Sequence, residues 1–207
     1  MNGKRENTIG DFIEYLSMRG YSPRTVEAYD EHLKKFSGFI EKYYPRITAF
    51  SDVSKDIIQD YQRFVCSIRT REGRPLANTS QNKKLTPVRK FFSFLLERDL
   101  VLRDPTKALV HMKEEQRLTR NIFSEQEVRE LFESIDVRAP VGLRNRAIVE
   151  LLYACGIRTS ELCNLKVEDI DFKEQTVTVV KGKGGKSRLM PIGQYASLYI
   201  ERYCVFR

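Results

Sequence analysis

The sequence predicts a mainly α-helical chain with one small β-hairpin, an α+β fold divided into two domains. Apolar residues recur about every 3.6 residues from residue 9 to residue 98, which is the period of helices with one buried face. An alternating run at 176–180, a glycine-rich turn and a second apolar run at 188–192 form the pattern of a hairpin. The stretch near 107–120 is polar and weakly periodic. We therefore expect a helical domain at 1–106, a linker at 107–121 and a second domain at 122–207.

Composition and charge exclude several classes of protein. No run of about 18 apolar residues is present to span a membrane, and the first residues lead into no secretory signal. Only two histidines are present and the four cysteines are scattered. We therefore expect no metal site, no disulfide framework and reduced thiols in a cytoplasmic protein. The net charge of +8 favours a polyanionic partner.

The positive charge is concentrated in one part of the first domain. Residues 63–90 contain eight basic residues and a single acidic one, Glu72. The phosphate backbone of a nucleic acid would attract such a cluster through the release of condensed counterions. A solvated helix face is the alternative for any one of these residues. The basic residues are Arg63, Arg69, Arg71, Arg74, Lys83, Lys84, Arg89 and Lys90.

Four helices are expected in the first domain. The first has an apolar face over residues 9–16 and stops at Gly20. Ser22 and Pro23 begin the second, because serine is a favoured N-cap and proline lacks the N–H that the first helical position leaves unbonded. The third follows Ser54.

The fourth helix is expected at about residues 78–98. Pro87 lies inside this pattern, so we expect a kink or a late helix start near it. We interpret the aromatic residues of this helix as core rather than as a surface for stacking bases. The apolar side comprises Leu85, Val88, Phe91, Phe92 and Leu95.

The second domain opens with a capping box. Ser124 is expected to accept from the N3 amide, and Glu127 to bond back to the N-cap. Helices are expected at about 125–134 and 143–154, with a short helix after Gly156. The hairpin and one further helix follow.

Arg158 follows a glycine on an otherwise apolar helix, so we expect its guanidinium to emerge beside the core. A buried unpaired charge is costly, so this side chain must pair with a carboxylate or contact an anion. Glu161, three residues on, shares the helix face and could orient it. Taken alone, the pattern favours a structural Arg158–Glu161 pair without a ligand.

Lys183 occupies the turn of the expected hairpin, flanked by glycines and close to Lys181, Lys186 and Arg188. Glycines allow the backbone of such a tip to approach a phosphate closely or to enter a groove. The segment lacks the spacing of a Walker A loop and precedes a strand rather than a helix. Taken alone, it is better explained as an ordinary hairpin turn.

Several segments match one family in order and spacing. They are SPRTV at 22–26, KKL at 83–85, RKFF at 89–92, SEQEV at 124–128, LLYACGIRTSEL at 151–162 and VVKGKGGKSRLMP at 179–191. Together they resemble the phage-integrase and Xer-type tyrosine recombinases. The first half is similar to the SAM-like core-binding domain of that family, a four-helix bundle, and the second half to its catalytic domain. The resemblance extends over nearly the whole chain.

The resemblance implies a DNA-binding portion of a site-specific recombinase, with 122–207 as the N-terminal part of an incomplete catalytic domain. Arg158 would hold non-bridging oxygens of the scissile phosphate, Lys183 would protonate the leaving 5′-oxygen, and Glu161 would orient Arg158. The implied reaction is a transesterification through a 3′-phosphotyrosine, with no metal or other cofactor. The implied partners are double-stranded DNA and other recombinase protomers, as a tetrameric synapse in the complete protein. The residues expected to contact DNA are Arg24, Lys83, Lys84, Arg89, Lys90, Lys181, Lys186 and Arg188.

The sequence departs from the family in one respect. The 207 residues contain no His-x-x-Arg box and no tyrosine at the position of the nucleophile. Tyr195, Tyr199 and Tyr203 form one helical stripe after the hairpin, and we interpret them as packing or surface residues. Catalytic residues of this kind act as a unit, so we expect this chain alone to be unable to cleave DNA. We interpret the chain as truncated within the catalytic domain.

Two other interpretations stay open at this point. One is a non-catalytic, regulatory relative that occupies recombination sites or joins mixed synapses. The other is a type IB topoisomerase, whose catalytic residues are similar and which would relax supercoils as a monomer. The helical first domain favours a recombinase over a topoisomerase.

Overall fold

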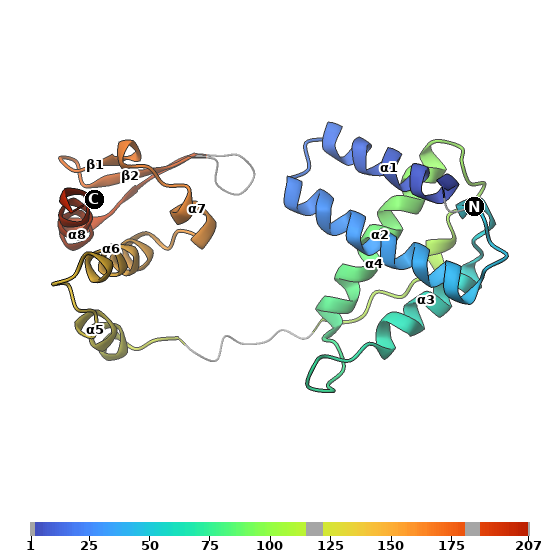
Figure 1. Cartoon of the computed structure of the whole chain (residues 1–207), viewed down its shortest axis with the longest axis horizontal. Coiled ribbons are helices and arrows are strands. Elements are labelled where there is room, and N and C mark those ends of the chain that lie inside the picture. The colour runs from blue at the N-terminus through green and yellow to red at the C-terminus, as the bar shows by residue number, and fades with distance from the viewer. Residues whose placement is uncertain (1–2, 115–121, 181–186, 207) are drawn as a thin grey trace. The chain divides into compact units, whose positions relative to one another are not determined.

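The computed structural model describes residues 3–114, 122–180 and 187–206 (Figure 1). The chain divides into two compact units, Met1–Arg117 and Leu118–Arg207, each with its own hydrophobic core. Within the described ranges, no helix combines the length and the apolar content that crossing a membrane requires. The expected fold class, mainly helical with a small sheet, is confirmed.

Where it is described, the first unit is a bundle of four α-helices, as expected, followed by a short 3₁₀ helix, η2 (Pro105–Ala108). The α-helices are α1 (Gly3–Met18), α2 (Pro23–Tyr43), α3 (Lys55–Ser67) and α4 (Asn78–Glu97), with a short 3₁₀ helix, η1 (Phe50–Asp52), between α2 and α3. Ser22 caps α2 by accepting from the amide of Thr25 at 3.3 Å, and Ser54 caps α3 in the same way through Ile57 at 3.4 Å. These caps satisfy amides that the first helical turn leaves without a partner, which fixes where each helix begins.

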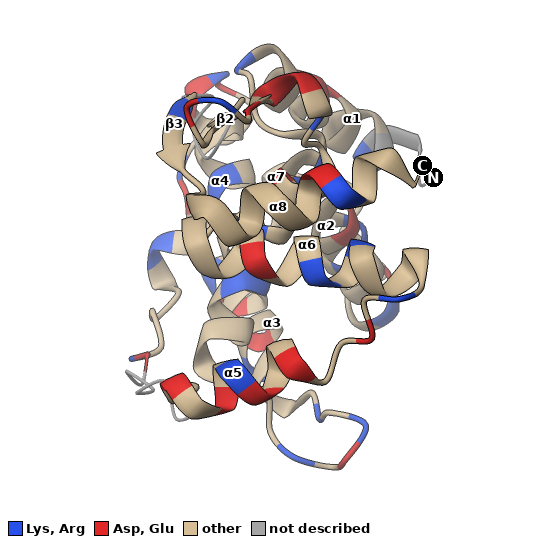
Figure 2. Cartoon of the chain, turned by 90° about the vertical axis from the view of Figure 1, so that its left-hand side faces the viewer, with Lys and Arg blue, Asp and Glu red and all other residues tan. Residues whose placement is uncertain are grey.

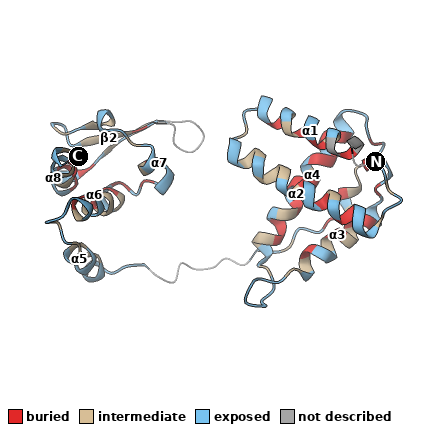
Figure 3. Ribbon diagram, in the orientation of Figure 1, coloured by how far each residue is buried: buried red, intermediate tan, exposed pale blue. Residues whose placement is uncertain are grey.

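The core of the first unit is rich in aromatic rings. Phe36 packs edge-on against Tyr61 with ring centroids 4.8 Å apart, and Phe50 packs edge-on against Phe91 at the same distance. The whole expected apolar side of α4 is buried, so its aromatic residues are core, as predicted. Figure 3 shows buried residues on the facing sides of these helices and exposed residues on the opposite sides.

Helix α4 is continuous through Pro87, so the late helix start that we considered is wrong. A proline in a helix interior removes one backbone hydrogen bond and costs about 3 kcal/mol. Pro87 is itself buried, and its neighbour Val88 is fully buried. Packing of this face against the bundle core offsets the unfavourable local preference.

The segment that follows the bundle is fastened to it by side-chain amides. Gln62 of α3 bonds both to the carbonyl of Val110 at 2.7 Å and to its amide at 3.1 Å. Asn82 of α4 does the same with Met112, at 2.8 and 3.1 Å. Each side-chain amide thus makes, with the N–H and C=O of one backbone residue, the pair of hydrogen bonds that a neighbouring β-strand would make. The described part of the expected linker, 107–114, therefore belongs to the first unit.

The described part of the second unit combines four α-helices and one short 3₁₀ helix with a small antiparallel sheet. In chain order its elements are α5 (Glu125–Glu133), α6 (Pro140–Cys155), α7 (Thr159–Cys163), η3 (Val167–Asp169), β1 (Ile170–Asp171), β2 (Thr176–Val179), β3 (Arg188–Pro191) and α8 (Gly193–Val205). The strand order is β1-β2-β3, with Val177 opposite Ile170 on one side and Met190 on the other. The expected hairpin is confirmed as β2 and β3, and the two-residue strand β1 was not foreseen. Val177 and Val179 point into a core shared with α6 and α8.

Helix α5 contacts α6 through Arg146 and through the ring of Phe132, which packs edge-on against Tyr153. The predicted capping box at Ser124 and Glu127 starts this helix, but none of its residues is buried. Arg146 of α6 donates to the carbonyl of Phe132 at 2.6 Å and lies over its ring at 4.5 Å. The other partners of Arg146 are Glu150, at 2.8 Å, and the ring of Tyr199, at 4.6 Å. Figure 2 shows that the charged residues of α5 are mainly acidic.

The Asn82 contact gives a first testable prediction. Replacing Asn82 with Ala removes both bonds to Met112 and leaves that backbone without its partners, which costs about 1–3 kcal/mol for a buried polar group. We expect the amide of Met112 to lose its protection in hydrogen exchange while the amides of α2 keep theirs. Lys83→Ala, at the exposed neighbouring position, is the control and should leave exchange at Met112 as in the parent chain. Unchanged protection of Met112 in Asn82→Ala would contradict the assignment.

Candidate functional site

The turn between α6 and α7 places Arg158. Gly156 ends α6 in the left-handed region with φ of 56°, a conformation that glycine adopts at low cost. Arg158 then takes an extended conformation as the N-cap residue of α7. Its side chain is 56% exposed. The guanidinium is thus in a turn at the surface, and our expectation that it would emerge from a helix beside the core is corrected.

Glu161 is the partner of Arg158, as predicted. Its Oε1 accepts from Nη1 of Arg158 at 2.9 Å, and its Oε2 accepts from the Arg158 backbone amide at 2.9 Å. Only 6% of the Glu161 side chain is exposed. The carboxylate therefore fixes both the main chain and the side chain of Arg158.

Arg188 of β3 is a second partner of the same carboxylate. Its Nη1 donates to Oε1 of Glu161 at 3.0 Å, and its Nη2 donates to Oε2 at 2.7 Å. This is the bidentate geometry in which an arginine binds a carboxylate most strongly. This contact could not be predicted from local sequence patterns, because the two residues lie 27 positions apart.

The two arginines determine the ionisation of Glu161. Hydrogen bonds from Arg188, and then those from Arg158, lower the pKa of Glu161 from 4.5 to about 2. The bond to Glu161 in turn raises the pKa of Arg188. Burial raises the pKa of the nearby Cys155 thiol, whose Sγ lies 3.3 Å from the carbonyl of Pro191. The cluster of Arg158, Glu161 and Arg188 therefore carries one net positive charge at neutral pH.

One edge of the Arg158 guanidinium is available to a ligand. Within the described parts of the chain, its Nε and Nη2 make no hydrogen bond to the protein, whereas Nη1 is bound to Glu161. Nε and Nη2 form a fork that matches two oxygens of a phosphate group. The arrangement can hold an oxyanion with a guanidinium that is already oriented.

The three lysines expected at the hairpin tip, Lys181, Lys183 and Lys186, lie outside the described residues. The strands that flank this segment are described. Val179 of β2 is paired with Arg188 of β3, so the contact of Arg188 with Glu161 fastens this end of the hairpin to the α6–α7 turn.

Two of the cations expected to contact DNA are already engaged within the first unit. Arg89 donates to the carbonyl of Leu109 at 2.7 Å. Lys90 donates to the hydroxyl of Tyr21 at 3.0 Å, and this bond raises the pKa of the lysine. Both line a surface depression of about 290 Å³, together with Arg19, a cation that we did not single out from the sequence. Arg19 follows the apolar pattern of α1 and lies far from the basic cluster in sequence, so only the fold reveals it.

The other expected cations of the first unit are Arg24, Lys83 and Lys84. Arg24, at the start of α2, and Lys83 of α4 are exposed. Lys84 is half-buried close to His32, where burial, and then the charge of Lys84, lower the pKa of the imidazole. Lys83 and Lys90 are two helical turns apart and thus share a face of α4.

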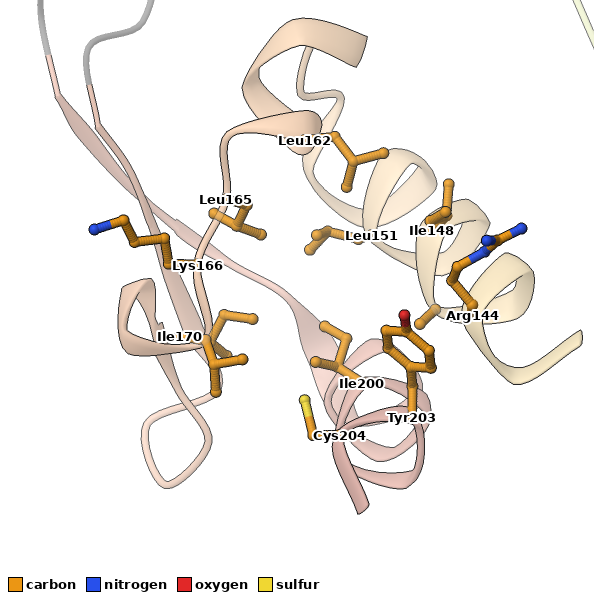
Figure 4. Close-up of a pocket in the computed structure, with 12 residues that line it drawn as sticks. Arg144, Ile148, Leu151, Leu162, Leu165, Lys166, Ile170, Ile200, Tyr203 and Cys204 are labelled. Atoms are coloured by element: carbon orange, nitrogen blue, oxygen red, sulfur yellow. The ribbon is translucent and has the colours of Figure 1, made fainter. Parts of the chain in front are cut away.

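The second unit also has an apolar pocket of about 210 Å³. Figure 4 shows side chains from α6, from α8 and from the segment after α7 converging on it. Tyr203 lines this pocket and Tyr199 packs against the core, whereas Tyr195 is exposed, in agreement with their interpretation as packing or surface residues. Within the described ranges no cluster of three metal-ligating side chains occurs.

Comparison with known proteins agrees with this arrangement. The sequence profile of the phage integrase N-terminal SAM-like domain matches residues 9–99, and that of the phage integrase family matches residues 121–207. The tyrosine recombinase XerC of Bacillus pumilus is 38% identical over 193 residues, which make up 93% of this chain and 60% of that protein. The XerC of Staphylococcus carnosus is 37% identical over 89% of this chain and 59% of its own length. The chain thus spans about 60% of the length of these curated relatives.

Solved structures give the same fold. A lambda integrase dimer bound to a COC′ core site matches with a TM-score of 0.68 and 17% identity, over 95% of this chain and 68% of that one. The Tn1549 transposon integrase in complex with circular intermediate DNA matches with a TM-score of 0.64 and 15% identity, over 97% of this chain and 65% of that one. The two profiles together account for most of the sequence, and each falls on one of the two units. The chain therefore belongs to the phage integrase family of tyrosine recombinases.

Proposed function

We propose that this chain is the DNA-binding portion of a site-specific tyrosine recombinase that binds duplex DNA and holds the phosphate at which strands are exchanged. The observation that carries the proposal is Arg158, a half-exposed arginine oriented by a nearly buried carboxylate with one edge of its guanidinium unengaged. In the absence of a ligand this exposed edge bonds to water, and its two nitrogens are oriented to bind two oxygens of an anion. A phosphate would supply those oxygens.

Arg158 would bind two non-bridging oxygens of the scissile phosphate through Nε and Nη2. Charge accumulates on these oxygens when a nucleophile attacks phosphorus, and an arginine already oriented by Glu161 stabilises that charge without rearranging. Lys183 would protonate the 5′-oxygen as it leaves. The exchange conserves the phosphodiester energy, because a phosphotyrosine ester replaces one phosphodiester bond and a 5′-hydroxyl later displaces the tyrosine.

The bundle would supply most of the affinity for DNA. Arg24 and Lys83 are exposed, and Arg19, Arg89 and Lys90 line one depression. Cations of this kind bind the phosphate backbone and position the protein without reading sequence. The further partners that we propose are other recombinase protomers, since a related lambda integrase forms a tetramer bound to a Holliday junction. The site of action that we propose is bacterial DNA in the cytoplasm.

The role of Arg158 predicts a defined change in DNA binding. Arg158→Ala should weaken binding to a labelled 30-base-pair duplex about fivefold to tenfold at low salt, because one charge-assisted phosphate contact is lost. The slope of log K against log salt concentration should fall in magnitude by about 0.9, the value for one phosphate contact. Fluorescence anisotropy at several salt concentrations measures both quantities.

The control for this experiment is Arg129→Ala. Arg129 is an exposed arginine on the acidic helix α5, so its removal lowers the net charge by the same amount without touching the proposed site. Binding by Arg129→Ala should stay within about twofold of the parent chain. Equal effects of the two substitutions, on affinity and on slope, would refute the assignment of Arg158.

The electrostatics of Glu161 predict a specific acid sensitivity. The pKa of Glu161 is lowered by the fold from 4.5 to about 2, so its contribution to stability is present above pH 4.5 and is lost as the pH falls to about 2. Glu161→Gln should lower the urea midpoint at pH 7 and flatten its fall across that window. The exposed carboxylate of Glu168 supplies the control, Glu168→Gln, which should follow the parent curve. A parent-like acid slope in Glu161→Gln would contradict the ion cluster.

The residues that are present also predict that this chain alone does not cleave DNA. No His-x-x-Arg box occurs in these 207 residues, so half of the phosphate-stabilising set is absent. We expect this chain alone to form no covalent protein–DNA adduct with a nicked suicide substrate, as judged by denaturing electrophoresis, although it binds that substrate. An adduct that maps to any tyrosine of this chain would overturn the expectation.

A further inference from the structure

Arg188 was expected to contact DNA, but its guanidinium is already committed within the protein. Both of its terminal nitrogens donate to Glu161, at 3.0 and 2.7 Å. Its Nε lies 3.2 Å from the sulfur of Met190. Its side chain is 35% exposed, compared with 56% for Arg158. The two arginines thus share one carboxylate, and as far as the described residues go Arg158 has an unengaged edge whereas Arg188 has none.

The hydrogen bonds around Glu161 show what Arg188 adds. Oε1 accepts from Nη1 of both arginines, and Oε2 accepts from the Arg158 amide and from Nη2 of Arg188. Each oxygen therefore has two donors, and the plane of the carboxylate is fixed from two sides. Without Arg188, the two oxygens would keep only the contacts made by Arg158, and rotation of the carboxylate would move the Arg158 guanidinium with it.

Charge provides a second and independent reason. A lone Arg158–Glu161 pair is neutral and would attract a phosphate weakly. With Arg188 the three-residue cluster has one net positive charge, so it attracts an anion to the exposed edge of Arg158. The bonds from Arg188 and Arg158 also hold the pKa of Glu161 at about 2, so the carboxylate stays ionised at neutral pH.

We infer that Arg188 is a positioning residue, which orients Arg158 through Glu161 and ties strand β3 to the α6–α7 turn, and that it does not itself bind DNA phosphate. The inference rests on the proposed function of Arg158. Arg188 thus has a different role from the lysines of the 181–186 segment that precedes it. Because Val179 and Arg188 are paired, the same contact would also fix the hairpin base relative to Arg158.

A double-mutant cycle tests the inference with the chain as it exists. Arg188→Gln should weaken binding to the labelled duplex about as much as Arg158→Ala, which is about fivefold to tenfold. The double variant Arg158→Ala/Arg188→Gln should have a dissociation constant within about twofold of that of Arg158→Ala. Its salt slope should equal that of Arg158→Ala. A direct phosphate contact by Arg188 would instead give additive losses and reduce the magnitude of the slope by a further 0.9 or so.

A second double-mutant cycle, with Glu161→Gln, tests whether Arg188 acts on Arg158 through Glu161. If Arg188 acts through the carboxylate, Arg188→Gln should have less than a twofold effect on DNA binding in the Glu161→Gln background. Arg188→Lys keeps the charge but loses the bidentate bond, so it should recover part of the affinity with the full salt slope of the parent. The exposed Arg202→Gln on α8 is the charge-matched control and should bind as the parent does.

Two outcomes separate failure of the inference from failure of the proposed function. If the parent chain does not bind the duplex, or Arg158→Ala binds as well as the parent, the proposed function fails. If Arg158→Ala weakens binding and Arg188→Gln adds an independent loss, only the role of Arg188 is overturned. Circular dichroism checks the fold of each variant. Should Arg188→Gln not fold, Arg188→Lys combined with Arg158→Ala decides the question, because additive losses would again contradict the inference.

Discussion

The carboxylate of Glu161 lies where the α6–α7 turn meets strand β3, and it accepts hydrogen bonds from two arginines that the sequence places far apart. Breaking a nearly buried pair of this kind costs more than forming it gains, because the remaining charge is left without its partner. Helix α7 is short, and β3 has only four residues. Neither element would hold an arginine accurately by itself, so the ion cluster determines the geometry of the candidate site.

Packing beneath the cluster supports this geometry. Ile157, next to Arg158, is buried in the core that Val177 and Val179 share with α6 and α8. Gly156 turns the chain so that Ile157 enters this core while Arg158 reaches the surface. In the first unit, the aromatic core positions the helices. The side-chain amides of Gln62 and Asn82 then bind the segment that follows the bundle. In both units, therefore, a hydrophobic core positions polar side chains. Their hydrogen bonds then hold the segment after the bundle in the first unit and the ion cluster in the second.

Local patterns in the sequence predicted much of this fold. The four long helices, the caps at Ser22 and Ser124 and the hairpin all follow from residues that are neighbours along the chain. The pairing of Arg158 with Glu161 was predicted for the same reason, since the two lie within one helical turn. What could not be predicted depends on residues distant in sequence: Arg188 is 27 positions from Glu161, and Gln62 is 48 positions from Val110. The continuity of α4 through Pro87 likewise depends on burial in the bundle, which local preference does not encode.

The central claim is that Arg158 binds phosphate while Arg188 stays on Glu161. Nitrogen-15 spectra of the arginine side chains, recorded as a short duplex is added, test it directly. Our account predicts that the Nε–H signal of Arg158 shifts in step with duplex binding, whereas that of Arg188 keeps its position. A shift of the Arg188 signal with no change at Arg158 would contradict the account.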